Sequence, residues 1–138
     1  NFLSVLIANS ADEMAGFLRK SGQQVEVGSI PHIATSGNET RTVTNYAASV
    51  YLGDLLVTCY SLYSRNRTFG NMIGKGYSVK TAQLEMNMVA EGYNASRCIF
   101  VINEKVRAEM PIAETIYHIL WNGLKPGVGF EKIESVLV

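Results

Sequence analysis

Charged side chains are scarce in this 138-residue chain, where they make up 17% of the residues against about 25% in an ordinary soluble domain. Twelve basic and twelve acidic residues balance to a formal net charge of zero. A protein that binds nucleic acid or a charged membrane surface usually carries a strongly basic face. The composition therefore argues against both kinds of partner. The low charge also predicts that part of the surface faces another protein segment.

Long apolar runs and clustered cysteines are missing as well. An apolar stretch such as residues 99–102 is far shorter than the roughly 20 residues that cross a bilayer. The two cysteines, Cys59 and Cys98, lie among apolar neighbours without a C-x-x-C spacing or a clustered histidine. This pattern predicts two buried free thiols, with neither a zinc site nor a disulfide framework.

The 47% apolar content and the length describe one globular domain whose core needs no disulfide or metal. The first segment, from Leu3 to Lys20, repeats apolar residues at helical spacing and is predicted to be an amphipathic helix. Residues 21–46 are polar and rich in serine, threonine and glycine, which predicts a long loop or insertion with at most a short strand.

The remaining chain predicts a series of helices and no βαβ alternation, so the fold class is all-α. One helical region covers Asn45 to Tyr63 with an interruption at Gly53-Asp54, and the glycines of residues 64–77 argue against a helix throughout. Capping and proline signals place the later helices at Val79 to about Met88, about Ala90 to Asn103, Pro111 to Gly123, and from about Phe130.

Two segments contain residues suited to binding small polar ligands. Asp54 is either a solvent-facing residue near a helix start or a partly buried carboxylate that needs a partner, for which Arg65 is the nearest following cation. The tetrapeptide Ser64-Arg65-Asn66-Arg67 suits a phosphate or polyhydroxyl ligand, or is a solvated turn. The glycines of residues 70–76 do not match a P-loop, which argues against a nucleoside triphosphatase.

Other polar or soft side chains have simpler interpretations. His32 and His118 lack a nearby nucleophile and are interpreted as surface histidines. Met72, Met86 and Met88, together with Phe69 and Tyr77, are interpreted as core packing. Glu91 is an ordinary exposed helix glutamate by its spacing alone.

Several short motifs nevertheless follow one another in a specific order. They are Gly53-Asp54-Leu55 with Thr58-Cys59, then Ser64-Arg65-Asn66-Arg67-Thr68-Phe69-Gly70, Gly74-Lys75-Gly76, Met88-Val89-Ala90-Glu91-Gly92, and Glu109-Met110-Pro111-Ile112 with Tyr117. In order and spacing, from about Gly53 to Gly123, they resemble the C-terminal domain of bacterial NAD(P)-dependent glycerol-3-phosphate dehydrogenase. Asn1 resembles the entry of the family's Gly-Asp-Asn helix, whereas residues 21–50 do not follow the family pattern.

The resemblance implies that residues 1–138 form a helical substrate domain that closes against a separate Rossmann domain. Together the two would interconvert sn-glycerol 3-phosphate and dihydroxyacetone phosphate with NAD or NADP in the cytoplasm. By the same resemblance, the substrate-binding residues are Asp54, Ser64, Arg65 and Asn66. The cofactor-binding residues are Arg65, Val89 and Glu91.

The family's proton-transfer lysine lies upstream of Asn1, and neither Lys75 nor Lys80 matches its motif. Because hydride transfer also needs a Rossmann crevice, residues 1–138 alone are predicted to contain no catalytic residue and to be inactive. Two alternatives stay open: a related hydroxy-acid or sugar-phosphate dehydrogenase, and a stand-alone helical binding or dimerisation module. Dimerisation through an exposed apolar face is compatible with each.

Overall fold

The computed structural model describes residues 2–21 and 50–138, with the side chains of the second range from residue 55 onward. These residues form helices and no strands, which confirms the all-α prediction. The helices are α1 (Phe2–Lys20), α2 (Val50–Tyr60), α3 (Arg65–Gly74), α4 (Val79–Glu85), α5 (Glu91–Val106), α6 (Pro111–Trp121) and α7 (Pro126–Glu134). The predicted loop at 21–46 lies outside the described residues, apart from Ser21.

Local sequence signals fix several helix ends. Ser64 and Ser78 stand before α3 and α4, and each hydroxyl accepts a hydrogen bond from a backbone N–H of the first turn. Pro111 and Pro126 occupy the first position of α6 and α7, where the missing N–H costs nothing. Gly123 follows α6 with a φ of +70°, a conformation that glycine adopts without strain.

Two boundary predictions were wrong, and the prediction for residues 64–77 was partly right, because a helix covers residues 65–74 but not the rest. Helix α2 runs through Gly53 and Asp54 without the expected interruption, and α3 continues through Gly70 despite its glycines. Helix α7 begins at Pro126 instead of near Phe130. A glycine inside a helix costs about 1 kcal/mol relative to alanine. In α3, the burial of Phe69 and Ile73 on one face outweighs this cost.

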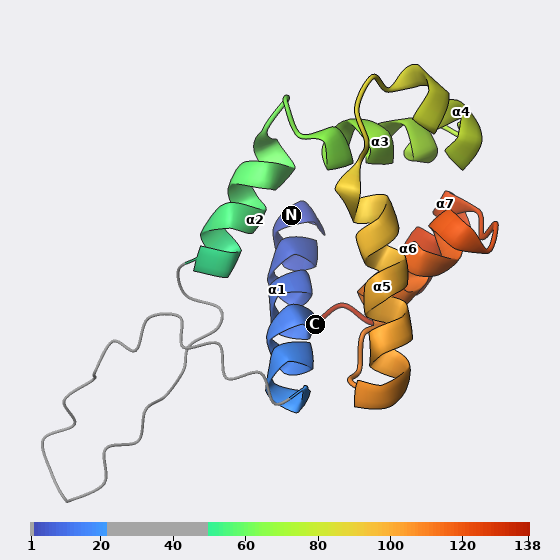
Figure 1. The fold of residues 1–138 in the computed structure, drawn as a ribbon. Helices are drawn as coiled ribbons and strands as arrows, with labels where there is room; N and C mark the ends of the chain where they lie inside the picture. Colours follow the sequence, from blue (N-terminus) through green and yellow to red (C-terminus); the bar gives the residue numbers. More distant parts are fainter. Residues whose placement is uncertain (1, 22–49) are drawn as a thin grey trace, which may run out of the picture.

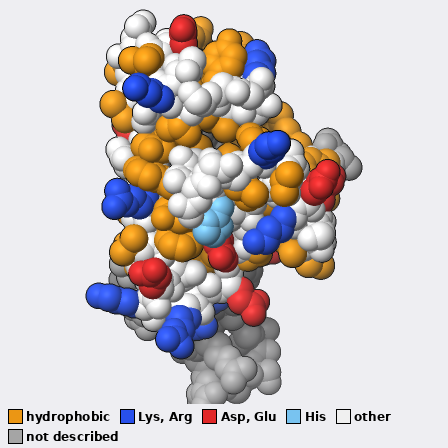
Figure 2. Space-filling model, turned by 90° about the vertical axis from the view of Figure 1, so that its right-hand side faces the viewer, with side chains coloured by type: hydrophobic (Ala, Val, Ile, Leu, Met, Phe, Trp, Pro, Cys, Tyr) orange, Lys and Arg blue, Asp and Glu red, His pale blue; other side chains and the backbone are white. Residues whose placement is uncertain are grey.

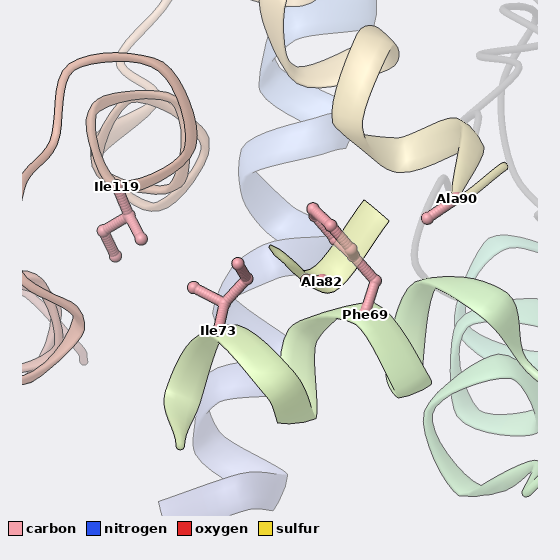
Figure 3. Close-up of a cluster of buried hydrophobic side chains, with 5 residues drawn as sticks. All are labelled: Phe69, Ile73, Ala82, Ala90 and Ile119. Carbon is pink, nitrogen blue, oxygen red and sulfur yellow. The ribbon is translucent and has the colours of Figure 1, made fainter. Parts of the chain in front are cut away.

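A cluster of buried apolar side chains lies between α3, α4, α6 and the start of α5. Its buried members are Phe69, Ile73, Ala82, Ala90 and Ile119, and Figure 3 shows Phe69 and Ile73 projecting from one helix while the other three come from different segments. In Figure 1, α1 lies beside α5, while α3 and α4 cross the end where α5 begins. The C-terminus returns to α1, where the Asn9 side chain bonds to both the N–H and the carbonyl of Val138.

Many large apolar side chains remain at the surface, as the low charged fraction led us to expect. Those more than half exposed include Val57, Leu62, Tyr63, Leu84, Met88 and Val89. Figure 2 shows hydrophobic side chains between the charged ones over one face of the molecule. Within the described residues, no helix is both long enough and apolar enough to span a membrane.

The predicted burial of both thiols is corrected by the structure. Cys98 is exposed on α5 and Cys59 is only half-buried on α2, although both are free. Cys98 follows Arg97 on a helix with no fully buried residue, so its apolar neighbours in sequence do not place it in the core.

Candidate functional site

A cavity of about 380 Å³ opens where α2 ends and where α3 and α5 begin. We call it the polar cleft, and its lining residues are Val57, Thr58, Ser61, Tyr63, Ser64, Arg65, Asn66 and Glu91. Four of the six residues predicted as binding residues, namely Ser64, Arg65, Asn66 and Glu91, therefore meet in one place. Residues 64–66 and 91 are far apart in sequence, and the packing of α3 against α5 brings them together.

Ser64 and Arg67 hold the start of α3 in position. The Ser64 hydroxyl accepts the Arg67 N–H at 3.2 Å, and its carbonyl oxygen accepts the Thr68 N–H at 3.0 Å. The Arg67 Nη1 donates to the Tyr60 carbonyl oxygen at 3.0 Å, which ties the end of α2 to α3. These bonds fix the turn from which the Arg65 and Asn66 side chains project.

Arg65 and Glu91 form an ion pair across the polar cleft. The Arg65 Nη2 lies 3.2 Å from the Glu91 Oε1, and the two side chains are 42% and 77% exposed. An exposed pair of this kind contributes at most about 1 kcal/mol to stability. The pair therefore opens at little cost, and the other guanidinium donors of Arg65 stay available to an anionic ligand.

Asn66 connects α3 to the first turn of α5. Gly92 donates its backbone N–H to the Asn66 Oδ1 at 2.9 Å. The residue before α5, Ala90, supplies no side-chain cap of its own, so Asn66 provides the missing acceptor from another helix. Within the described residues, the Asn66 Nδ2 keeps no hydrogen-bond partner and can donate to a ligand.

The structure does not bring every predicted site residue to the polar cleft. Val89 is 65% exposed and lines a neighbouring cavity of about 200 Å³. Asp54 belongs to α2, but its side chain lies outside the described residues, so its predicted pairing with Arg65 stays a prediction.

Thr58, Ser61 and Tyr63 also line the polar cleft and were missed by the sequence reasoning. Thr58 and Ser61 are three residues apart around the end of α2, a spacing that places side chains on one helical face. That spacing, close before the Ser64-Arg65-Asn66 triplet, was the signal available in the sequence.

A second cavity, of about 430 Å³, shares Asn66 with the polar cleft and is lined mainly by apolar residues. Its walls include Gly70, Ile73, Ile119 and Phe130. Met72 and Met86 pack against the adjoining core as predicted, whereas Met88 and Tyr77 are 61% and 47% exposed and are not core residues. This cavity offers few groups that could bind a polar substrate.

Neither the histidine nor the acidic residues of the described part form another site. His118 is partly exposed beside Glu114 and contacts Asn122 and Phe100, while His32 lies outside the described residues. No group of three or more metal-ligating side chains occurs within residues 2–21 and 50–138.

Fold and site together define a helical domain that presents a cation, a carboxylate and an amide at the starts of two helices. The chain belongs to the NAD-dependent glycerol-3-phosphate dehydrogenase C-terminus family, whose model matches residues 1–131. This finding confirms the resemblance that the motifs between Gly53 and Gly123 carry.

Curated relatives agree with the family assignment. Proteins named glycerol-3-phosphate dehydrogenase (NAD(P)+) from Shewanella oneidensis and Shewanella baltica are each 47% identical to this chain over 75 residues. The match covers 54% of this chain and 22% of each relative, so the chain aligns with about a fifth of their length. No solved structure matches the chain.

Proposed function

We propose that this chain is the substrate domain of a glycerol-3-phosphate dehydrogenase, which interconverts sn-glycerol 3-phosphate and dihydroxyacetone phosphate with NAD(H) or NADP(H). The observation that carries the proposal is the polar cleft, where Ser64, Arg65, Asn66 and Glu91 meet. The family assignment and the names of the relatives support the same activity.

Arg65 and Asn66 suit the phosphate end of the substrate. A guanidinium binds phosphate oxygens through two parallel N–H bonds, and Arg65 is partly exposed in a weak ion pair that a dianion can replace. The Asn66 Nδ2, which has no hydrogen-bond partner among the described residues, supplies a further donor. Ser64 lies beside them in the polar cleft, and Asp54 is the proposed acceptor for a substrate hydroxyl.

Glu91, Val89 and Arg65 are the proposed contacts to the cofactor. The Glu91 carboxylate is 77% exposed at the rim of the polar cleft and can accept hydrogen bonds from a ribose hydroxyl or an amide. Val89 offers an exposed apolar surface beside it. When bound, the nicotinamide supplies or accepts the hydride. The residues of this chain orient the substrate and balance its charge.

We propose that the full-length protein combines this domain with a Rossmann domain, because hydride transfer needs a crevice that holds the nicotinamide against the substrate. The exposed Val57, Leu62 and Tyr63 beside the polar cleft support contact with another protein segment, either the Rossmann domain or a second copy. We further propose a cytoplasmic enzyme, as the family implies.

The test is dihydroxyacetone-phosphate-dependent oxidation of NADH and NADPH by the full-length polypeptide, measured beside the 138-residue chain. We expect activity in the full-length protein and none in residues 1–138 alone. A scan of other ketone and aldehyde phosphates separates this enzyme from a related sugar-phosphate dehydrogenase. Absence of activity with every such substrate would contradict the proposal and favour a binding module.

A further inference from the structure

Gly92 and Asn66 approach each other so closely that a side chain at position 92 would force one of them to give way by a few tenths of an ångström. A Cβ atom added to Gly92 would lie 3.0 Å from the Asn66 Oδ1, 3.1 Å from its Cγ and 3.3 Å from its Nδ2. These contacts are tighter than ordinary van der Waals separations. The Asn66 amide therefore rests directly on the bare backbone of Gly92.

The start of α5 is held too firmly to move away from such a side chain. Tyr93, the next residue, stacks on Trp121 with ring centroids 4.2 Å apart and meets Phe69 edge-on at 5.9 Å. The Trp121 Nε1 also donates to the Tyr93 carbonyl oxygen at 3.1 Å. On the other side, Ala90 is buried in the core. The Asn66 amide, which is exposed, is the partner that would have to shift.

The hydrogen bond also decides which end of the amide faces Gly92. A backbone N–H can donate only to the Oδ1, since the reversed amide would place two donors against each other. The Nδ2 is consequently the end of the amide that makes no bond to the Gly92 N–H and keeps its own N–H groups for another acceptor. A donor is what a phosphate-bearing substrate requires, whereas an exposed Oδ1 would oppose its charge.

We infer that Gly92 is a positioning residue for substrate binding: its N–H and its lack of a side chain hold the Asn66 amide so that the Nδ2 remains available as a donor. The inference rests on the proposed function, because it concerns the residue that presents a donor to glycerol 3-phosphate. Gly92 itself touches no substrate in this arrangement.

The experiment introduces Gly92→Ala into the full-length protein, with Gly70→Ala as the matched control. A Cβ added at Gly70 meets nothing within 4 Å, so both changes add one methyl group to a helix but only one disturbs Asn66. We expect Gly92→Ala to raise KM for dihydroxyacetone phosphate about 10-fold and to leave KM for the cofactor nearly unchanged. Gly70→Ala should alter neither constant.

A double-mutant cycle with Asn66→Ser separates positioning from a general effect on the fold. In the Asn66→Ser background, Gly92→Ala should change KM for dihydroxyacetone phosphate by less than about twofold, because the amide it displaces is gone. Thermal unfolding temperatures of all four proteins show whether they fold. If Gly92→Ala fails to fold and the double variant folds, the clash with Asn66 is confirmed.

Three results overturn the inference: an unchanged KM in Gly92→Ala, an equal increase in both backgrounds, or a folding defect that Asn66→Ser does not repair. Failure of the proposed function looks different. In that case the wild-type protein shows no activity with dihydroxyacetone phosphate, or Asn66→Ser leaves KM unchanged, and the inference falls with it.

Discussion

Helices α5 and α6 both begin without a cap from their own sequence, and each receives one from a distant helix. Ala90 and Met110 precede them and make no side-chain cap bond. Asn66 of α3 accepts the Gly92 N–H of α5. Glu13 of α1 accepts the Ile112 N–H of α6 at 3.0 Å and the Ala113 N–H at 2.8 Å. The same device thus joins α3 to α5 and α1 to α6.

The two caps differ in what they leave unused. Asn66 is exposed, lines the polar cleft and accepts through its one oxygen, which leaves its Nδ2 without a hydrogen-bond partner among the described residues. Glu13 is half-buried and both of its oxygens accept backbone N–H groups. Burial raises the pKa of the Glu13 carboxyl; the two backbone bonds oppose this effect and the nearby Glu114 adds to it. A cap with a spare donor can serve a ligand, whereas a saturated cap serves the fold.

We expect the largest effect, a loss of kcat/KM, from a substitution in the polar cleft. Arg65→Ala in the full-length protein should lower kcat/KM for dihydroxyacetone phosphate about 100-fold, or about 3 kcal/mol, because a charge-assisted phosphate contact is lost. The thermal unfolding temperature should hardly change, since the Arg65–Glu91 pair is exposed. Arg97→Ala, on the Trp121 ring outside the polar cleft, is the control. An unchanged kcat/KM in Arg65→Ala would remove Arg65 from the site.

Glu13→Ala should show the opposite pattern. We expect the free energy of unfolding to fall by about 1–2 kcal/mol, because two N–H groups of α6 lose their acceptors, while KM stays unchanged. Chemical denaturation of the full-length protein measures the first quantity and steady-state kinetics the second. Asp12→Ala, at the neighbouring exposed position, should affect neither. A raised KM in Glu13→Ala would show that the saturated cap also supports the site.

Helices α6 and α7 also meet at a glycine, Gly129. Here the groups in close contact are apolar. A Cβ added to Gly129 would lie 2.6 Å from the Ile119 Cδ1 and 3.2 Å from the Thr115 Cγ2, whereas one added to Gly127 meets nothing within 4 Å. Gly129→Ala should therefore destabilise the protein by about 1 kcal/mol through overpacking, and Gly127→Ala should not. Equal unfolding midpoints for the two variants would show that Ile119 yields freely.

The smallest expected effect concerns pH. Because the folded-state pKa of Glu13 is raised, the folded protein binds more protons than the unfolded chain between the ordinary and the raised value. The stability contributed by Glu13 is thus greatest at acid pH and is lost as the pH rises through the raised pKa. We compare the thermal unfolding temperatures of the wild type and Glu13→Gln. Their difference, wild type minus variant, should decrease as the pH rises from the ordinary to the raised pKa of Glu13. A difference that stays constant or grows with pH would contradict the direction of the shift.

Sequence reasoning recovered the parts of the molecule whose causes are local. The serine cap at Ser78 and the first-turn proline at Pro111 act within one turn, and both appear as predicted. The incomplete prediction for residues 64–77 and the error at Cys98 have another origin. Whether a glycine-rich segment stays helical, or a thiol becomes buried, depends on neighbours that arrive from other helices.

At the candidate site, the sequence likewise predicts which residue types are present, whereas contacts between helices set how they are arranged. The sequence determined the all-α fold class, the family, and the presence of Ser64, Arg65, Asn66 and Glu91, because spacing and motif order are properties of the chain itself. Only the tertiary structure decided that Arg65 pairs with Glu91, that Asn66 caps α5 and that Val89 faces another cavity. The first two relations join residues 26 positions apart, and the packing of α3 against α5 around Phe69 and Tyr93 sets them.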